Sequence, residues 1–469
     1  MLSALGRFCG IQGNKEEQLK FVLLTFAFML VIGAYTIAKE LKDSVFVNIV
    51  GPDYLPKAKM MVILMLIPAA LLYSVLVDSL RRYQLFGLYC MIFGVISLGM
   101  GLLLGHPTIG LANIEVSPYR VFGWVFYFVF EGFSPYVVGV CWAFANSITS
   151  PEEAKGNYVT MVAGSKIGGM ITALFAWQLL QSLGCSWWSN FTGVQAHQVL
   201  MFIIAGMLLC VPLVLYYMIK AVPGRYLHGY ESVYQLEKQK SVEGKSSTGI
   251  WTGIKIMAQS PYILGIFGLV FFYETLSVIL SFQRILILKG AATSLELFTA
   301  SMFKQRFYMH LSGFLLSLIG VRYLVRSLGE RKSLLLVPAC IAVLLLYFMV
   351  TYSPESVLFV FIALGSINYS LSHPLRETLF IPATKDIKFK SKAWIDSFGT
   401  KFSKMFGSVF NDFSQKIATP GTFVSNIIYS TFFVGLVSAW FATAYLLGRT
   451  YEKAVSEDKI IGEELTEQK

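Results

Sequence analysis

Charged residues are scarce in this chain. Only 14% of its 469 residues are Asp, Glu, Lys or Arg, whereas 55% are hydrophobic. An ordinary soluble domain is about 25% charged. The composition therefore excludes a soluble protein and predicts an all-α membrane protein.

Motifs for metal binding and catalysis are also missing from the sequence. The six cysteines form no C-x-x-C pair, the five histidines are dispersed, and neither H-E-x-x-H nor G-x-S-x-G occurs. The run Gly164-Ser165-Lys166 lacks the upstream glycine of a phosphate loop, and we interpret Gly164 and Gly168 as a G-x-x-x-G helix-packing motif. We expect no enzyme, no metal and no cofactor.

Long apolar segments are abundant. Each approaches the roughly 20 residues that cross a hydrocarbon core of about 30 Å. Two sets of six predict twelve transmembrane helices in two six-helix bundles. The segments are 21–48, 59–79, 84–104, 119–148, 157–181 and 198–219, then 261–286, 300–325, 333–352, 356–383, 396–418 and 423–448.

One long polar stretch, near residues 220–259, separates the two sets. We predict an N-terminal bundle over 1–221 and a cytoplasmic linker over 222–257. A C-terminal bundle over 258–450 and a cytoplasmic tail over 451–469 follow.

Basic residues are distributed unevenly between alternate loops. The loops at 182–197, 353–356 and 419–422 contain no Lys or Arg, whereas the loops on the other side are rich in both. This asymmetry predicts that both termini are cytoplasmic. It also explains the net charge of +11 without a nucleic-acid partner, so the lipid bilayer is the expected surrounding.

The first apolar segment is longer than the core of a signal peptide, and no small-residue cleavage site follows it. The short start also lacks the length and the Ser- and Arg-rich composition of a plastid transit peptide. We therefore expect a bacterial inner membrane.

Five ionisable residues lie inside the apolar segments: Lys42, Glu131, Glu274, Arg376 and Lys404. A charge at bilayer depth costs about 2.5 to 3.5 kcal/mol on insertion scales, so it commonly faces a polar pathway. This pattern predicts a transporter for a charged solute.

The two glutamates lie near the middle of the fourth and seventh segments. Corresponding depth in the two halves is typical of a transporter with a site at the membrane midplane. The alternative for Glu131 and Glu274 is a buried structural pair or a protonated hydrogen bond between helices.

Cations lie at similar depths. Lys166 and Lys404 are central in the fifth and eleventh segments, and Arg376 lies in the inner half of the tenth. Several cations in one cavity favour a polyanion, since Arg binds phosphate oxygens with its planar fork and Lys as a point charge. For Arg376 the alternative is a local ion pair with Glu377 or Asp386.

In the first segment Lys39 and Lys42 share a helix face with Tyr35, which could line a vestibule. For Lys39 we favour the alternative that its ammonium reaches the outer membrane interface.

Several blocks resemble the nucleotide transporter family, the ATP/ADP translocases of plastids and obligate intracellular bacteria. Residues 38–43, Ala-Lys-Glu-Leu-Lys-Asp, look like the family's Leu-Arg-Asp-Thr-Lys-Asp. Residues 130–132, 144–149 and 153–155 are similar to its Ala-Glu-Leu, Phe-Ala-Asn-Gln-Ile-Thr and Glu-Ala-Lys. Residues 374–377, Pro-Leu-Arg-Glu, resemble Pro-Cys-Lys-Glu, so the resemblance extends over nearly the whole chain.

The resemblance implies a major-facilitator-like fold and a nucleotide substrate. It transfers the family's functional residues to Lys42, Glu131, Glu274 and Lys404, and it adds Asn146 as a candidate binding residue. Arg376 and Lys166 depart from the family pattern.

Our hypothesis is a monomeric ATP/ADP antiporter that works by alternating access around a central basic cavity. Lys42, Arg376 and Lys404 would receive the phosphates, while Glu131 and Glu274 would bind ribose or base, or pair with the cations in the empty site. The alternative is a proton-coupled importer of nucleoside triphosphates, NAD or another organic anion in the same fold.

Overall fold

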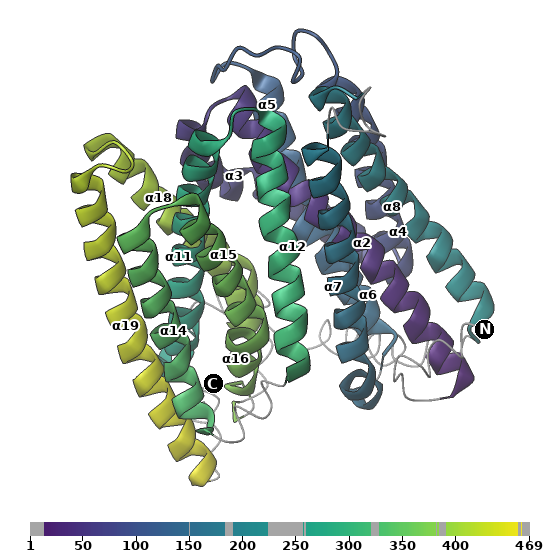
Figure 1. The fold of residues 1–469 in the computed structure, drawn as a ribbon. Coiled ribbons are helices and arrows are strands. Elements are labelled where there is room, and N and C mark those ends of the chain that lie inside the picture. The colour runs from purple at the N-terminus through teal and green to yellow at the C-terminus, as the bar shows by residue number, and fades with distance from the viewer. Residues whose placement is uncertain are drawn as a thin grey trace. The chain divides into compact units, whose positions relative to one another are not determined.

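The computed structural model describes residues 14–149, 151–182, 191–223, 257, 259–319, 328–380, 382–383, 391–457 and 461 (Figure 1). In these parts of the chain the regular elements are helices, apart from a single bridge between Ala383 and Ile461. The predicted all-α class is confirmed.

Twelve helical spans, some of them interrupted, occur in the described ranges, as predicted. Eight of them are long and apolar enough on their own to cross a membrane. The first six spans are α2 (Lys15–Ile49), α3 (Leu55–Ser79), α4 (Arg82–Leu104), α5 (Val121–Glu131) with η2 (Ser134–Val138) and α6 (Gly139–Ser147), α7 (Pro151–Gln181), and α8 (Gly193–Ala221). The last six are α11 (Pro261–Ala291), α12 (Leu295–Ile319), α14 (Glu330–Thr351), α15 (Pro354–Ile367) with η4 (Asn368–Ser372) and α16 (His373–Thr378), α17 (Lys392–Trp394) with η6 (Ile395–Gly399) and α18 (Thr400–Ile417), and α19 (Phe423–Ser456).

Hydroxyl side chains cap three of the helices. Thr192, Ser353 and Thr422 precede α8, α15 and α19, and each accepts a hydrogen bond from a backbone N–H in the first turn. Such a cap satisfies a donor that has no partner within the helix. All three caps lie in the loops that lack Lys and Arg, so each of these helices begins at an uncharged cap.

The chain forms two compact units. The first comprises Met1–Ser246 with Ala292–Leu311, and the second comprises Ser247–Ala291 with Ser312–Lys469.

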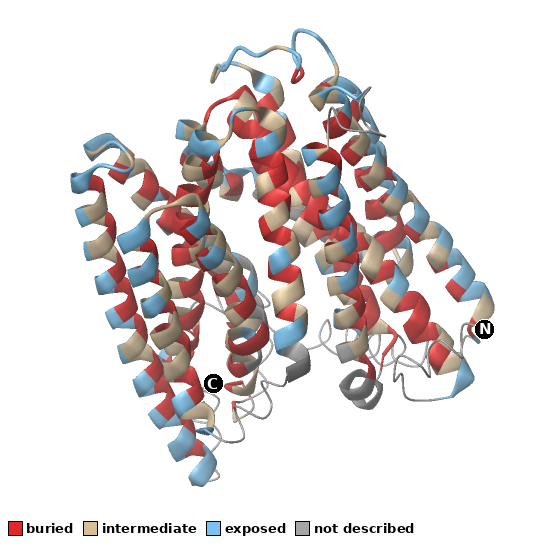
Figure 2. Ribbon diagram, viewed as in Figure 1, coloured by how far each residue is buried: buried red, intermediate tan, exposed pale blue. Residues whose placement is uncertain are grey.

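In the first unit α2 is the central helix and is buried over most of its length (Figure 2). It packs against α5, α7 and α8, while α4 packs against α8. A Cβ on Gly164 would clash with Thr25 Cγ2, and one on Gly168 would clash with the Met29 carbonyl oxygen. The predicted G-x-x-x-G motif is therefore confirmed as the place where α7 closely approaches α2.

In the second unit α11 is the central helix. It packs against α15, α18 and α19, and α14 packs against α19. The Thr275 hydroxyl donates to the Ser403 carbonyl oxygen at 3.2 Å, and a Cβ on Gly407 would lie 2.7 Å from the Thr275 carbonyl oxygen. A glycine at 407 is thus required for the close contact between α11 and α18.

Helix α12 is divided between the units. We predicted the whole of this helix in the C-terminal bundle, but its part up to Leu311 groups with the first unit. Polar contacts along one face of α2 and one face of α12 explain this grouping. The contacts, which we call the polar seam, are Ser44 with Thr299, Glu40 with Arg306, and Thr36 with His310.

Candidate functional site

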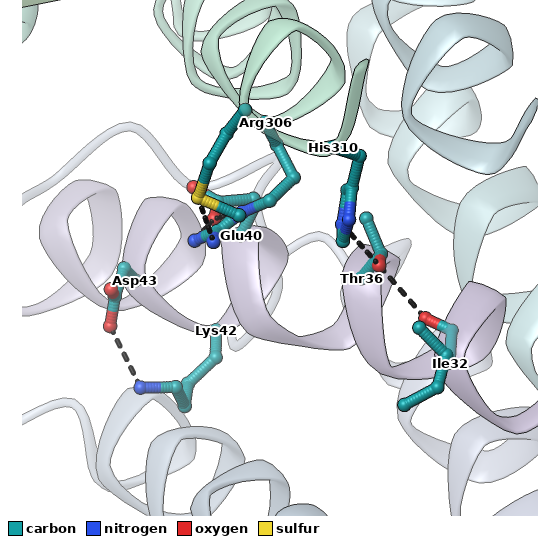
Figure 3. Close-up of polar contacts among 8 residues, drawn as sticks. Ile32, Thr36, Glu40, Lys42, Asp43, Arg306 and His310 are labelled. Carbon is teal, nitrogen blue, oxygen red and sulfur yellow. Dashed lines mark hydrogen bonds and ion pairs between the residues drawn. The ribbon is translucent and has the colours of Figure 1, made fainter. Parts of the chain in front are cut away.

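Lys42 is the centre of a buried charge group in the first unit. Its ammonium lies 2.9 Å from Asp43 Oδ1 and 3.0 Å from Glu131 Oε2, and 4.3 Å from the centroid of the Tyr127 ring. The Lys42 side chain is 8% exposed, and the Glu131 side chain is 21% exposed. Figure 3 shows the contact between Lys42 and Asp43 on α2. Two predicted site residues, Lys42 and Glu131, are therefore brought together.

Close packing of α5 on α2 positions this group. A Cβ on Gly123 would lie 2.5 Å from Val50 Cγ2, so glycine is needed where the two helices meet. The Phe46 and Tyr127 rings pack with their centroids 5.0 Å apart. The π-helical turn η2 begins three residues after Glu131, and such turns occur frequently at functional sites.

A second Lys–Glu pair lies in the other unit. Lys404 Nζ, on α18, is 3.5 Å from Glu274 Oε2, on α11. The Lys404 side chain is 38% exposed and the Glu274 side chain 20%, so this pair is more open than the first. The contacts of Thr275 and Gly407 described above hold the two helices in place, and the π-helical turn η6 ends directly before α18.

Arg376 lies half-buried in α16, shortly after the π-helical turn η4. We considered an ion pair with Glu377, but the Glu377 carboxylate bonds to Lys392. The guanidinium of Arg376 interacts electrostatically with the Asp396 carboxylate. The other proposed partner, Asp386, lies outside the described residues.

Tyr35 contacts the span that carries Glu131 two residues beyond that glutamate, whereas Asn146 lies far along the same span. The Tyr35 ring is 5.9 Å from the ring of Phe133, two residues beyond Glu131, and the Lys39 ammonium lies 5.6 Å from the Tyr35 centroid. Asn146 accepts a hydrogen bond from the Tyr158 hydroxyl at 2.7 Å. It follows Glu131 by 15 residues, which is roughly 22 Å along a helix.

Lys166 belongs to a different group of charges. The positive charges of Arg306 and Lys39 both repel the Lys166 ammonium. We did not single out Arg306 or its buried partner Glu40 from the sequence, nor His310. The available signal was the spacing of Arg306 and His310, which lie four residues apart and so on one face of the same helix.

Sequence comparison identifies relatives of the chain. The model of the family described as TLC ATP/ADP transporter matches residues 114–362. ADP,ATP carrier protein 3 of Rickettsia felis is 22% identical over 93% of this chain and 95% of its own length. The chloroplastic ADP,ATP carrier protein 2 of Arabidopsis thaliana is 25% identical over 94% of this chain and 76% of its own length.

Solved structures show the same fold. A D-xylose–proton symporter matches with a TM-score of 0.57 and 13% identity, over 92% of this chain and 96% of its own. The nucleoside transporter NupG gives a TM-score of 0.53, with 12% identity over 91% of this chain and 98% of its own. At this identity the similarity supports the major-facilitator-like fold alone.

Proposed function

Since this chain belongs to the TLC ATP/ADP transporter family, we propose that it exchanges ATP for ADP across a bacterial inner membrane. The observation that supports this proposal best is a Lys–Glu pair within the apolar spans of each unit, Lys42 with Glu131 and Lys404 with Glu274. Charges within a membrane are costly and commonly serve a transport pathway.

In this scheme Lys42, Arg376 and Lys404 receive the nucleotide phosphates. Glu131 and Glu274 neutralise the lysines while the site is empty, and they bind ribose or base when phosphate takes their place. Contacts of an ammonium group to carboxylate and to phosphate are both charge-assisted, so a phosphate can take the place of the glutamate at comparable strength.

Lys166, Tyr35 and Asn146 are assigned as further substrate-binding residues along the pathway. The protein works as a monomer, with both termini in the cytoplasm.

Transport proceeds by alternating access, in which residues 1–221 move against residues 258–450. The part of α12 that groups with the first unit then has to separate from α2, so the polar seam opens once in each cycle. No covalent step is required.

Exchange of ATP for ADP moves about one net charge. One charge is worth roughly 2.3 kcal/mol per 100 mV of membrane potential. The potential therefore influences the direction of exchange.

The test uses purified protein in liposomes that contain ADP, with uptake of labelled ATP as the readout. Lys404→Gln should reduce uptake sharply, because Glu274 then lacks its cation and phosphate lacks its receiver. Lys416→Gln is the matched control, since Lys416 lies on the same helix, is 68% exposed and pairs with Asp412 one turn away. It should leave uptake unchanged.

Two results contradict the proposal. Absence of ATP uptake by correctly inserted wild-type protein refutes nucleotide exchange. Uptake into vesicles without internal nucleotide, driven by an imposed pH gradient, assigns proton-coupled import instead.

A further inference from the structure

Helices α14 and α19 of the second unit pack side by side, and each exposes a row of apolar side chains. On α14, Val343 and Val350 are 68% and 76% exposed, and their spacing keeps them on one helix face. On α19, Val434 and Tyr445 are 68% and 44% exposed. Exposed residues recur along α19 in Figure 2. Both helices are long and apolar enough to cross a membrane, so these rows face lipid.

A cation lies at the end of each row. Lys332 lies about five helical turns before Val350, so both residues are on the same face of α14. These turns span about 27 Å, close to the hydrocarbon thickness of about 30 Å. On α19, Arg449 follows Tyr445 by one turn and is exposed as well. The lipid-facing rows therefore end in positive charge where the phospholipid headgroups begin.

Arg331 joins the two helices at this end. Its guanidinium lies 4.7 Å from the centroid of the Tyr445 ring, and its Nη1 donates to Glu452 Oε2 at 3.3 Å. A Cβ on Gly448 would lie 2.8 Å from Arg331 Cγ, so the glycine lets α19 approach α14 closely. The Arg331 side chain nevertheless remains 30% exposed. Its fork is thus held at the surface of the helix junction, at the same depth as the two cations.

Cations outnumber carboxylates at this junction by four to three among the described residues. Glu452 is already bonded to Arg331, and Glu457 Oε1 lies 3.9 Å from Lys453 Nζ. The four cations are Arg331, Lys332, Arg449 and Lys453, and the three carboxylates are Glu330, Glu452 and Glu457.

Lys332 and Arg449 are the two cations that can accept an outside anion. Both are exposed, and neither makes a hydrogen bond or an ion pair in the described parts of the chain. They lie on neighbouring helices, next to the Arg331 fork and directly below apolar surface. This combination of positive charge and apolar surface is complementary to a phospholipid with an anionic headgroup.

We propose that Arg331, Lys332 and Arg449 bind the phosphate of an anionic phospholipid, with its acyl chains along the exposed rows of α14 and α19. Basic sites between membrane helices bind anionic headgroups. An arginine fork binds phosphate oxygens through two contacts, and a lysine binds them as a point charge. The lipid bridges the two helices and stabilises their packing. The site is independent of the proposed nucleotide exchange, because none of its residues belongs to the substrate pathway.

The test measures thermal unfolding of purified full-length protein in nonionic detergent as phosphatidylglycerol is added. This lipid should raise the unfolding temperature in a saturable way, because it binds the folded protein. Phosphatidylcholine, which has no net charge, should not. In K332Q/R449Q the phosphatidylglycerol concentration for half of the effect should rise roughly thirtyfold, about fivefold for each lost cation. Both substituted residues are exposed, so the unfolding temperature without lipid reports any structural damage separately.

Two further variants separate a specific site from net charge. K57Q/K416Q is the matched control, because it removes the same number of exposed cations from α3 and α18. It should leave the half-effect concentration unchanged. K332R/R449K, which keeps both charges in place, should remain within about threefold of the wild type.

Equal weakening in K332Q/R449Q and K57Q/K416Q would mean that only net charge matters, and would overturn the site. A wild-type response in K332Q/R449Q, or equal stabilisation by phosphatidylcholine, would overturn it as well. Inorganic phosphate is the last arm. If phosphate at the same concentration stabilises the wild type as well as the lipid does, the cations bind a free anion and the lipid assignment fails.

Discussion

The buried Glu40–Arg306 pair should dominate the electrostatic contribution to stability in the first unit. Removal of one partner from a buried ion pair costs about 3 to 5 kcal/mol, because the remaining charge is left without compensation in a medium of low dielectric constant. Both residues are at least 95% buried, so this range applies to Glu40→Gln.

The neighbouring lysines make the two single variants unequal. Glu40→Gln removes the carboxylate that Arg306 bonds, and the positive charges of Lys39, Lys166 and Arg306 remain close enough to repel one another. Arg306→Met leaves Glu40 with two lysines whose charges act on the same site. We therefore expect Glu40→Gln to cost more free energy of unfolding than Arg306→Met. The double variant should cost less than the sum of the two, since no isolated charge remains.

The assay is reversible denaturation of the purified protein in mixed micelles, with linear extrapolation to zero denaturant. An exposed pair on α19 provides the control: Lys453 Nζ lies 3.9 Å from Glu457 Oε1, and the side chains are 70% and 52% exposed. Removal of this pair should change stability by about 0.5 kcal/mol or less. A loss below about 1 kcal/mol for Glu40→Gln, or a greater loss for Arg306→Met, would refute the reasoning.

Two other predictions concern motion and the loop before α5. Opening of the polar seam predicts that a disulfide in S44C/T299C, where the native hydroxyl oxygens are 2.5 Å apart, stops ATP uptake until a reductant is added. A disulfide in T25C/G164C should leave uptake intact, because it joins α2 to α7 within one half and a Cβ at 164 lies 3.8 Å from that of Thr25, the usual separation. Continued uptake by oxidised S44C/T299C would exclude an opening seam. In the loop before α5, Arg120 donates to four backbone carbonyl groups, so Arg120→Lys should speed amide exchange there, and an unchanged rate would contradict this role.

Most of the fold could be predicted from hydropathy. The segment predicted at 84–104 is α4 (Arg82–Leu104), because the thickness of the hydrocarbon core fixes the apolar length of a helix. Helix ends in water were harder to predict. The segment predicted to end at 448 continues as α19 to Ser456, since its last turns are polar and need no membrane.

The site was only partly predictable. Depth in the membrane identified Lys42 and Glu131 as candidates, but their contact depends on how α5 packs against α2, which a single sequence does not encode locally. Asp43 was not expected as a partner of Lys42, because adjacent residues on a helix do not share a face. The long Lys42 side chain reaches it all the same. Arg306 and His310 were missed although they lie with Lys304 and Gln305 in α12, which is not among the eight helices that are apolar enough on their own to cross a membrane.

The balance of charge within the spans bears on the choice between exchange and proton coupling. Lys42 with Asp43 and Glu131 carries a formal charge of −1, and Lys404 with Glu274 carries none.

Each lysine is thus compensated by carboxylates, and a phosphate must displace Glu131 or Glu274 to bind it. A glutamate left without its cation in a closed site of low dielectric constant costs several kcal/mol, and each 1.4 kcal/mol slows a step about tenfold. Protonation would neutralise that glutamate, so uptake that depends on an imposed pH gradient favours proton coupling, whereas uptake that depends only on internal nucleotide favours exchange.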